Sequence, residues 1–404
     1  MNILVINPGG NSLKAEIVSC QKSQRYAFEG KSLLSVGIEG IGKDARISRY
    51  KSKKLVHSEA IQAADNGDAV LSLFKWYDKN AGDSSGSLES LQCIGVRVVH
   101  GGMDFDCPAL IDSRVEEKIT ALEKLAPLHN KSSIEVLAPL REKLPGVPIY
   151  GVFDTAFHRT IPEHAALYAI PPDLAVKHQI RRYGFHGISH RYLLERYAFV
   201  AGKEPSECDV VSTHLESGCS VTAVHQGKSI DNTMGLTPLE GLMMGTRSGD
   251  VDPSLIPLLM REERMTVDEV MELLNKKSGL LAVSGDSLDT RILMEHYESD
   301  PRVKLSMHMF AYRVRKTVGA YFAALGSGEA LIFGGGIAEN NRLIRQYVSE
   351  GLCSFGLDID HRANRTLIDI EGRLSTKASK LQAWVIPTQE SLQIAHECCL
   401  ATAR

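Results

Sequence analysis

The sequence predicts an α/β protein made of two related halves. Residues 3–20 read as a strand, a Gly-rich turn, a serine and a second strand, and residues 209–226 repeat that order. Setting Ser12 on Ser220 aligns the two strand pairs. Elsewhere strand-like and helix-like segments alternate, which is the pattern of mixed sheets covered by helices.

Length and composition limit the number of domains and the classes of binding partner. The chain has 404 residues, 43% of them hydrophobic, which favours two domains over one. A net charge of −3 gives no basis for general binding to nucleic acid or to an anionic membrane. No apolar run reaches the ~20 residues that a membrane helix requires. The eight cysteines form no C-x-x-C pair and no secretory signal is evident, so we expect a cytoplasmic enzyme with free thiols.

Later segments supply the remaining elements. Residues 147–153 read as a buried strand that ends at Asp154. Apolar side chains at spacings of three and four predict an amphipathic helix over 302–325. A strand, a triple-glycine turn and a helix beginning near 339–341 follow, and such a turn offers backbone N–H groups to an anion. Residues 383–386 read as the last strand.

The first Gly-rich loop is a candidate phosphate site. Gly9 and Gly10 allow close approach of a ligand, while Asn7, Ser12 and Lys14 offer polar contacts. An ordinary hairpin turn would give the same pattern. The loop is not a Walker A motif, because G-x-x-x-x-G-K-[ST] is absent from the sequence.

Charged residues at strand ends are the next candidates. Residues 95–102 read as a strand with Arg97 and Val99 on one face, where a guanidinium suits either an anionic ligand or an internal salt bridge. Asp154, at the end of a buried strand, suits an active-site carboxylate or a cap of the following segment. Glu390 follows the last strand and suits Mg²⁺ binding or the first turn of a helix.

Two further segments are rich in cations and glycine. In residues 181–192, His186 and His190 have no acidic or cysteine partner beside them, which favours an anionic ligand at a helix start over zinc. A structural role for His190 remains an alternative. Residues 233–254 place Arg247 among glycines, as expected of a clamp on a transferring phosphoryl group. Together these features favour nucleotide-dependent phosphoryl transfer.

In combination and in order, these motifs make the chain resemble the acetate and butyrate kinase (acetokinase) family. The similarity runs from end to end and rests on VINPGGNSLK, RVVHGG, APLHN, FDTAFH, RRYGFHGISHRY, MGLTPLEGLMMGTRSGDVDP, SGDSLDTR, GGGIAEN and IPTQESL. The resemblance implies the duplicated actin-like (ribonuclease H-like) fold of sugar kinases, with two lobes around a central cleft. Residues 1–154 plus 392–404 would form the acyl-substrate lobe, and residues 155–391 the lobe for nucleotide binding and dimerisation.

The resemblance also implies an activity and its partners. A phosphoryl group would pass reversibly and in line between ATP and acetate, giving acetyl phosphate and ADP, with Mg²⁺ or Mn²⁺ as cofactor. The enzyme would be a cytoplasmic homodimer that binds neither nucleic acid nor membrane. Because a carboxylic acid is already ionised at pH 7, the acceptor needs no general base.

By resemblance, the site residues fall into four groups. The catalytic group is Arg97, Asp154, His186 and Arg247. The acyl substrate would contact Arg97, Val99, Leu128, Phe185 and Pro238, and the metal would be organised by Asn7 and Glu390. The nucleotide would contact Ser12, Lys14, His214, Leu215, Glu216, Ser217, Gly218, Asp289, Thr290, Arg291, Gly336, Ile337, Ala338, Glu339 and Asn340.

The sequence departs from the family where phosphates are expected. The second phosphate loop usually reads His-Leu-Gly-Asn-Gly, but here Glu216 and Ser217 replace the glycine and the asparagine. A carboxylate 4 Å from a phosphate charge costs about 4 kcal/mol at an effective dielectric near 20. Gly10, Asn11, residues 129–133 and Ala338 also differ from the usual pattern. Propionate or butyrate as acceptor, a donor other than ATP, or a non-catalytic ligand-binding relative are therefore the alternatives.

Overall fold

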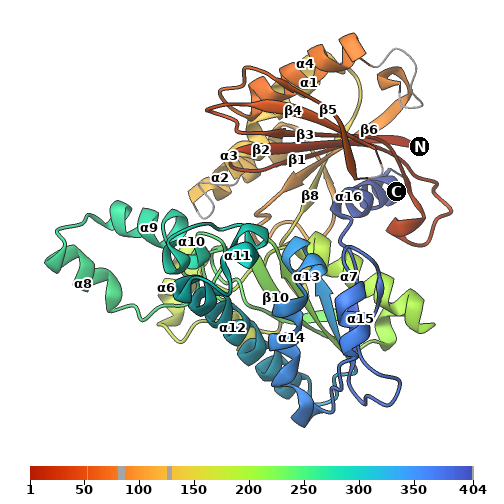
Figure 1. Ribbon diagram of the computed structural model, residues 1–404. Helices are drawn as coiled ribbons and strands as arrows, with labels where there is room; N and C mark the ends of the chain where they lie inside the picture. Colours follow the sequence, from red (N-terminus) through yellow and green to blue (C-terminus); the bar gives the residue numbers. More distant parts are fainter. Residues whose placement is uncertain (52, 81–86, 125–129, 403–404) are drawn as a thin grey trace. The chain divides into compact units, whose positions relative to one another are not determined.

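The computed structural model describes residues 1–51, 53–80, 87–124 and 130–402 (Figure 1). The chain divides into two compact units, each with a mixed sheet and helices, so the predicted α/β class is confirmed. Unit 1 comprises Met1–Arg159, Gly187–Tyr192 and Gln389–Arg404, and unit 2 comprises Thr160–His186 and Leu193–Thr388.

Unit 1 is built on a sheet with the strand order β5-β4-β3-β2-β1-β6-β8-β7. Strand β1 pairs antiparallel with β2 and parallel with β6, and β6 pairs parallel with β8. The strands are β1 (Asn2–Pro8), β2 (Ser12–Ser19), β3 (Lys31–Glu39), β4 (Arg46–Lys51), β5 (Lys54–Ala60), β6 (Leu91–Val98), β7 (Ala109–Leu110) and β8 (Ile149–Phe153). Because β1, β6 and β8 are parallel neighbours, their carboxyl ends meet at one edge of the sheet.

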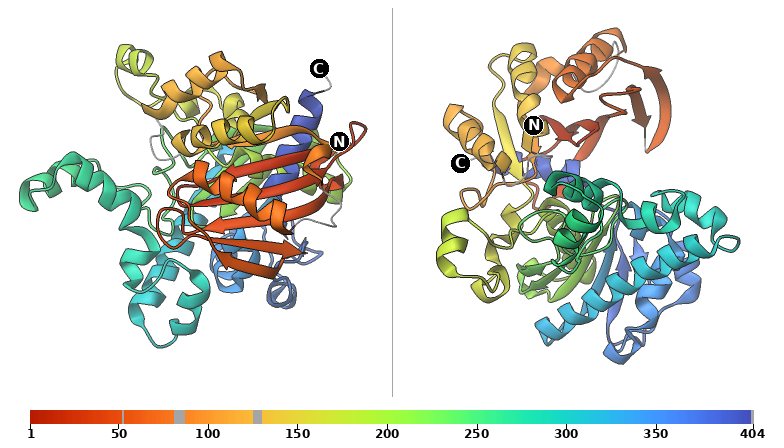
Figure 2. Two further views of the ribbon diagram at one scale, coloured as in Figure 1. Left: turned by 90° about the horizontal axis from the view of Figure 1, so that it is seen from above. Right: turned by 90° about the vertical axis from the view of Figure 1, so that its left-hand side faces the viewer.

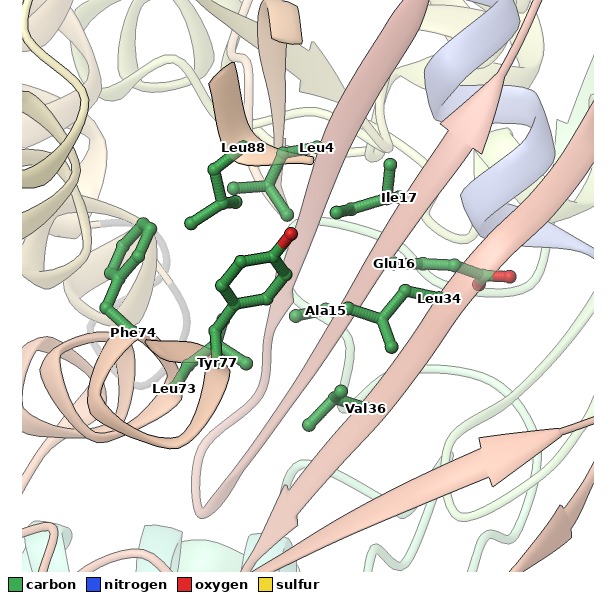
Figure 3. A pocket seen from close by; sticks show the side chains of 10 residues that line it. All are labelled: Leu4, Ala15, Glu16, Ile17, Leu34, Val36, Leu73, Phe74, Tyr77 and Leu88. Atoms are coloured by element: carbon green, nitrogen blue, oxygen red, sulfur yellow. The ribbon is translucent and has the colours of Figure 1, made fainter. Parts of the chain in front are cut away.

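Both faces of the unit 1 sheet are covered, which explains why β1 is an uninterrupted apolar run. Leu4 belongs to the core beneath α1 (Asn66–Asn80), whereas Val5 points to the opposite face and packs with Ile394 of α16 (Glu390–Ala401). Figure 3 shows the α1 side, where Phe74 and Tyr77 face the sheet around a gap of about 10 Å³. A gap of this size holds at most one water, so it is core packing. The other helices are α2 (Ser113–Ala121), α3 (Asn130–Glu135) and α4 (Leu137–Lys143).

Unit 2 repeats the central strand arrangement of unit 1. Its sheet has the order β11-β10-β9-β12-β14-β13, with β9 antiparallel to β10 and parallel to β12, which is parallel to β14. The strands are β9 (Val210–Leu215), β10 (Cys219–His225), β11 (Lys228–Asn232), β12 (Ala330–Gly334), β13 (Gly372–Arg373) and β14 (Gln382–Val385). The internal repeat predicted from the sequence is thus present as strand order.

The repeat does not extend to residue-by-residue register. In the first hairpin, the four residues 9–12 separate the paired Pro8 and Leu13. In the second, the three residues 216–218 separate the paired Leu215 and Cys219. The alignment of Ser12 with Ser220 therefore cannot hold for both strands of each pair.

Helices cover the sheet of unit 2. The predicted amphipathic helix is α12 (Pro301–Leu325), which packs against β9 and β10. The others are α5 (Glu163–Ala166), α6 (Pro172–His178), α8 (Leu255–Glu262), α9 (Val267–Lys276), α10 (Gly279–Ser284), α11 (Thr290–His296), α13 (Gly336–Asn340), α14 (Arg342–Glu350) and α15 (His361–Thr366), with α7 (Gly187–Ala201) contributing its later residues. Helices α8 and α9 extend away from the rest of unit 2 (Figures 1 and 2).

Two sequence-based boundaries were wrong. The strand expected over 95–102 ends at Val98, so Val99 lies beyond β6. The helix expected near 339–341 is two helices, because Asn341 leaves the helical conformation and its side chain caps α14 by accepting from Leu343 N and Ile344 N. Among the described residues, no helix has both the length and the apolar character needed to cross a bilayer.

Candidate active site

Polar side chains gather where β1, β6 and β8 of unit 1 end. Arg97 on β6 donates from Nε to Asp154 Oδ2 at 2.9 Å and from Nη1 to Asn7 Oδ1 at 3.0 Å. Asn7 in turn donates from Nδ2 to Glu390 Oε2, at the first turn of α16, at 3.1 Å. We call these four residues the Arg97 cluster. The parallel strand order thus brings together residues that are 383 positions apart in the sequence.

The Arg97 cluster is largely shielded from water. Asp154 is fully buried, and only 16% of the Arg97 side chain is exposed. A carboxylate in such a place is stable only with a charged or hydrogen-bonded partner, which Arg97 supplies. Arg97 therefore makes the internal salt bridge that the sequence left open as an alternative to an anionic ligand.

The oxygen atoms of the Arg97 cluster suit magnesium, but they are too few to coordinate the ion without other ligands. Asp154, Glu390 and the Asn7 amide offer oxygen atoms, the ligand type that Mg²⁺ prefers, and Mg²⁺ commonly uses one or two carboxylates with substrate phosphates. Within the described ranges, no group of three or more His, Cys, Asp or Glu side chains could hold a metal ion. A bound magnesium ion would consequently depend on oxygen atoms from substrate and water.

The segment after β6 is fixed by buried hydrogen bonds. His100 N donates to Asn130 Oδ1 at 3.0 Å, and Asn130 Nδ2 donates back to His100 O at 3.0 Å. Val99, expected to contact the acyl group, is buried beside this pair. Leu128, the other apolar residue expected from this part of the chain, lies outside the described residues.

A second cluster of predicted site residues lies in unit 2. His186 Nδ1 is 2.9 Å from Ser220 Oγ, and the His186 ring centroid is 4.3 Å from that of His214. A Cβ atom on Gly218 would lie 3.3 Å from His186 Nε2 and 3.4 Å from Arg247 Nη1. We call His186, His214, Gly218, Ser220 and Arg247 the His186 cluster. Gly218 lets its loop approach the His186 ring and the Arg247 guanidinium closely, which is the role expected of a glycine in a phosphate loop.

The loop that carries Arg247 is tied to the phosphate loop. Gly245 N donates to Ser217 O at 3.1 Å. Arg247 Nη1 lies 3.4 Å from the carbonyl oxygen of the buried Pro238. Desolvation lowers the pKa of the Arg247 guanidinium, but a guanidinium stays protonated at neutral pH, so a cation is held beside Gly218.

Beside the phosphate loop, unit 2 contains a cavity of about 650 Å³. Pockets of 300–1,000 Å³ are typical of small-molecule and cofactor sites. Predicted nucleotide-binding residues in its lining are Glu216, Ser217, Asp289, Thr290, Arg291, Gly336, Ile337 and Asn340. Lining residues that the sequence reading missed are Leu288, Met294, Asn341, Arg342, Arg365 and Ile368. Leu288 lies within the motif SGDSLDTR and Asn341 directly follows GGGIAEN, whereas Met294, Arg342, Arg365 and Ile368 belong to no motif quoted from the sequence.

Glu216, the unusual residue of the phosphate loop, does not turn away from the cavity. Its carboxylate Oε2 lies 3.6 Å from His214 Nε2, and 48% of the side chain is exposed. Its Cγ would lie 4.0 Å from a Cβ atom on Gly336. The negative charge therefore remains at the cavity wall but is paired with an imidazole and partly screened by solvent.

Other predicted nucleotide-binding residues lie elsewhere. Ala338 and Glu339 are buried and do not line the cavity. Glu339 Oε1 accepts from Gly335 N at 2.8 Å and from Thr388 N at 2.9 Å, which joins the ends of β12 and β14. Gly335 has φ +86°, and a Cβ there would lie 2.5 Å from Leu215 N, so this turn requires glycine. Ser12 and Lys14 belong to β2 of unit 1.

Comparison with known proteins identifies the family. The model of the acetokinase family matches residues 2–396. The chain belongs to this family. It is 40% identical over 408 residues to the acetate kinase of Chloroherpeton thalassium, covering 98% of each protein.

Solved structures agree with this assignment. The acetate kinase of Porphyromonas gingivalis is 35% identical, with a TM-score of 0.90 and full coverage of both chains. A propionate kinase from Francisella tularensis is 38% identical, with a TM-score of 0.88 and 98% coverage of each chain. The acetokinase fold predicted from the motifs is therefore confirmed.

Proposed function

We propose that this acetokinase-family protein transfers a phosphoryl group between ATP and acetate, giving acetyl phosphate and ADP. The observation that carries the proposal is the 40% identity to an acetate kinase over 98% of both chains. The described clusters suit the chemistry, since phosphoryl transfer depends on positioning and on charge neutralisation.

Each cluster has a proposed role. Arg97 binds the acceptor carboxylate in place of, or together with, its contact to Asp154. Asp154 organises the metal and its water, because an ionised acceptor needs no general base. His186 and Arg247 offset the charge that spreads over the transferring group, and an arginine in this role contributes about 10³–10⁵ in rate.

Magnesium is part of the proposal. Asn7, Glu390 and Asp154 would hold it, directly or through water. When bound, the ion neutralises charge on the phosphate oxygen atoms. The chain's own contribution is to orient the Glu390 carboxylate through the 3.1 Å hydrogen bond from Asn7.

The cavity of unit 2 supports a nucleotide as donor. Its volume of about 650 Å³ and its apolar wall of Leu288, Met294 and Ile337 suit a base and ribose, which pyrophosphate lacks. Arg342 and Arg365 add positive charge to the same wall.

Propionate is the second acceptor candidate, because one relative of similar identity is a propionate kinase. Val99, Phe185 and Pro238, the residues expected at the acyl group, are all buried. One methylene changes binding by only about 1–3 kcal/mol, so acetate and propionate must be compared directly.

A cytoplasmic homodimer is proposed as well. Helix α8 has the sequence LIPLLMRE, yet none of its side chains is buried, and Leu258 is 45% exposed. An apolar helix left open in this way suits a protein–protein interface. Sedimentation at micromolar concentration should give a dimer, and a monomer would refute this part of the proposal.

Hydroxamate trapping of acyl phosphate tests the function. Purified protein and Mg²⁺ would be incubated with acetate, propionate or butyrate, each against ATP, GTP and pyrophosphate. Turnover of acetate with ATP is the expected result. Turnover only with a longer acid or another donor would assign that acid and that donor as the substrates. No acyl phosphate from any combination would favour a ligand-binding relative.

A further inference from the structure

We propose that Asn232 is a positioning residue that holds His186 in the orientation needed for phosphoryl transfer. The inference rests on the proposed function, because it concerns a residue assigned to the transition state there. Asn232 belongs to no motif used to identify the family.

His186 has a backbone conformation that needs external support. Its φ is +57° at the residue preceding α7, a left-handed conformation that costs a non-glycine residue roughly 1–2 kcal/mol. Such conformations persist where contacts with surrounding residues enforce them, and they cluster at functional sites. The other non-glycine residues with positive φ in the described part of the chain are all exposed: Lys53, Gln179, Gln226, Arg264 and Asp369. His186 alone in that group is half-buried.

Asn232 fixes the peptide groups immediately before His186. Its Oδ1 accepts from Phe185 N at 3.3 Å, and its Nδ2 donates to Phe185 O at 3.2 Å. The same amide reaches β10, where Nδ2 donates to Thr222 Oγ1 at 2.7 Å. Asn232 is fully buried, so these hydrogen bonds form away from competing water.

Strand β10 also holds the imidazole ring. Ser220, whose Oγ is 2.9 Å from His186 Nδ1, lies two residues before Thr222 and therefore on the same side of the strand. The hydrogen bond between Ser220 Oγ and Nδ1 orients the ring. Its Cε1 and Nε2 atoms face Gly218, each 3.3 Å from where a Cβ would lie. Strand β10 thus positions both the backbone at His186, through Thr222 and Asn232, and the His186 ring, through Ser220.

Arg182 in turn holds the backbone at Asn232. Arg182 donates from Nη1 to Asn232 O at 2.6 Å and to Thr233 O at 3.1 Å. Its Nη2 donates to Glu240 Oε1 at 2.7 Å. The end of β11, which carries Asn232, is therefore anchored independently of His186, as a positioning element must be.

A double-mutant cycle tests the proposal. Asn232→Ala should lower kcat at least tenfold and change KM for ATP and acetate less than threefold, because an error of about 1 Å in a reacting group can cost 10²-fold in rate. In a His186→Ala background, the same substitution should change kcat less than twofold. Equal losses in both backgrounds would overturn the proposal, because independent effects are additive.

A spectroscopic measurement separates positioning from general damage. The His186 Hε1 resonance and its titration should move in Asn232→Ala and in Ser220→Ala. They should stay unchanged in Asn275→Ala, which removes a comparable amide hydrogen bond, to Met271 O at 2.9 Å in α9. An unchanged resonance in Asn232→Ala would refute the positioning role, even if the unmodified protein proved silent in the trapping assay and the proposed function had failed.

Discussion

Arg97 and Asp154 meet between neighbouring parallel strands, with Arg97 Nε 2.9 Å from a fully buried carboxylate. Replacing Arg97 with Leu removes the charged partner of that carboxylate. Breaking a buried pair costs about 3–5 kcal/mol, so we expect the free energy of unfolding in urea to fall by that amount. Adding Asp154→Asn should restore much of the stability without restoring turnover. Wild-type stability in Arg97→Leu would contradict this account.

Arg247→Ala should abolish turnover while nucleotide binding largely survives. Its guanidinium lies beside Gly218 and not in the cavity lining, so its loss should lower kcat by about 10³–10⁵. Trapping assays and nucleotide titration would measure the two effects separately. Arg362→Ala, at an exposed position of α15 outside the cavity lining, is the matched control. Near-normal turnover in Arg247→Ala would remove it from the catalytic group.

Glu216→Gln should lower KM for ATP modestly, by about 1.4- to 5-fold. The full Coulomb repulsion does not apply, because the carboxylate is 48% exposed and solvent screening reduces the effect to about 0.2–1 kcal/mol. KM for acetate should not change. An increase in KM for ATP would instead mean that Glu216 takes part in binding the nucleotide or its metal.

Arg342→Gln and Arg365→Gln should each raise KM for ATP about fivefold, since both line the cavity and each would lose a contact to the nucleotide of about 1 kcal/mol. Arg362→Gln lies on the same helix as Arg365 but outside the lining, so it should behave as wild type. Steady-state kinetics with varied ATP would decide. Unchanged KM in both variants would place the two arginines outside the nucleotide contact.

Cys219 should resist alkylation although it lies next to the phosphate loop. Burial raises its thiol pKa to about 12 from 9.0, so the reactive thiolate at pH 8 falls about 10³-fold. A raised pKa favours the neutral thiol, and this protection should weaken only as the pH approaches 12. Peptide mapping after iodoacetamide treatment should find the exposed Cys107 and Cys353 modified and Cys219 intact. Rapid loss of the Cys219 thiol at pH 8 would contradict its burial.

The sequence predicted those parts of the site that depend on backbone chemistry. Gly218 lies against His186 and Arg247, and Gly336 lines the cavity, so glycines in the sequence marked both places. The helix start expected near 339–341 agrees with Asn341 as the cap of α14, but the short helix α13 before it was missed. Arg342 and Ile368 become neighbours of one cavity only through tertiary packing, which no local pattern encodes. Asn232 was missed for the same reason.

Helix α16 has a consequence for the order in which the protein is made. Ile394 and Cys398 complete the core of unit 1 on the β1 face, yet they are synthesised only after residues 160–388, most of which form unit 2. Ribosomes add about 5–20 residues per second, so the 229 residues from 160 to 388 take roughly 10–45 s. During that interval the nascent first sheet carries an uncovered apolar face. A chain released before residue 389 would keep that face permanently, which makes premature termination within residues 160–388 a direct route to aggregation.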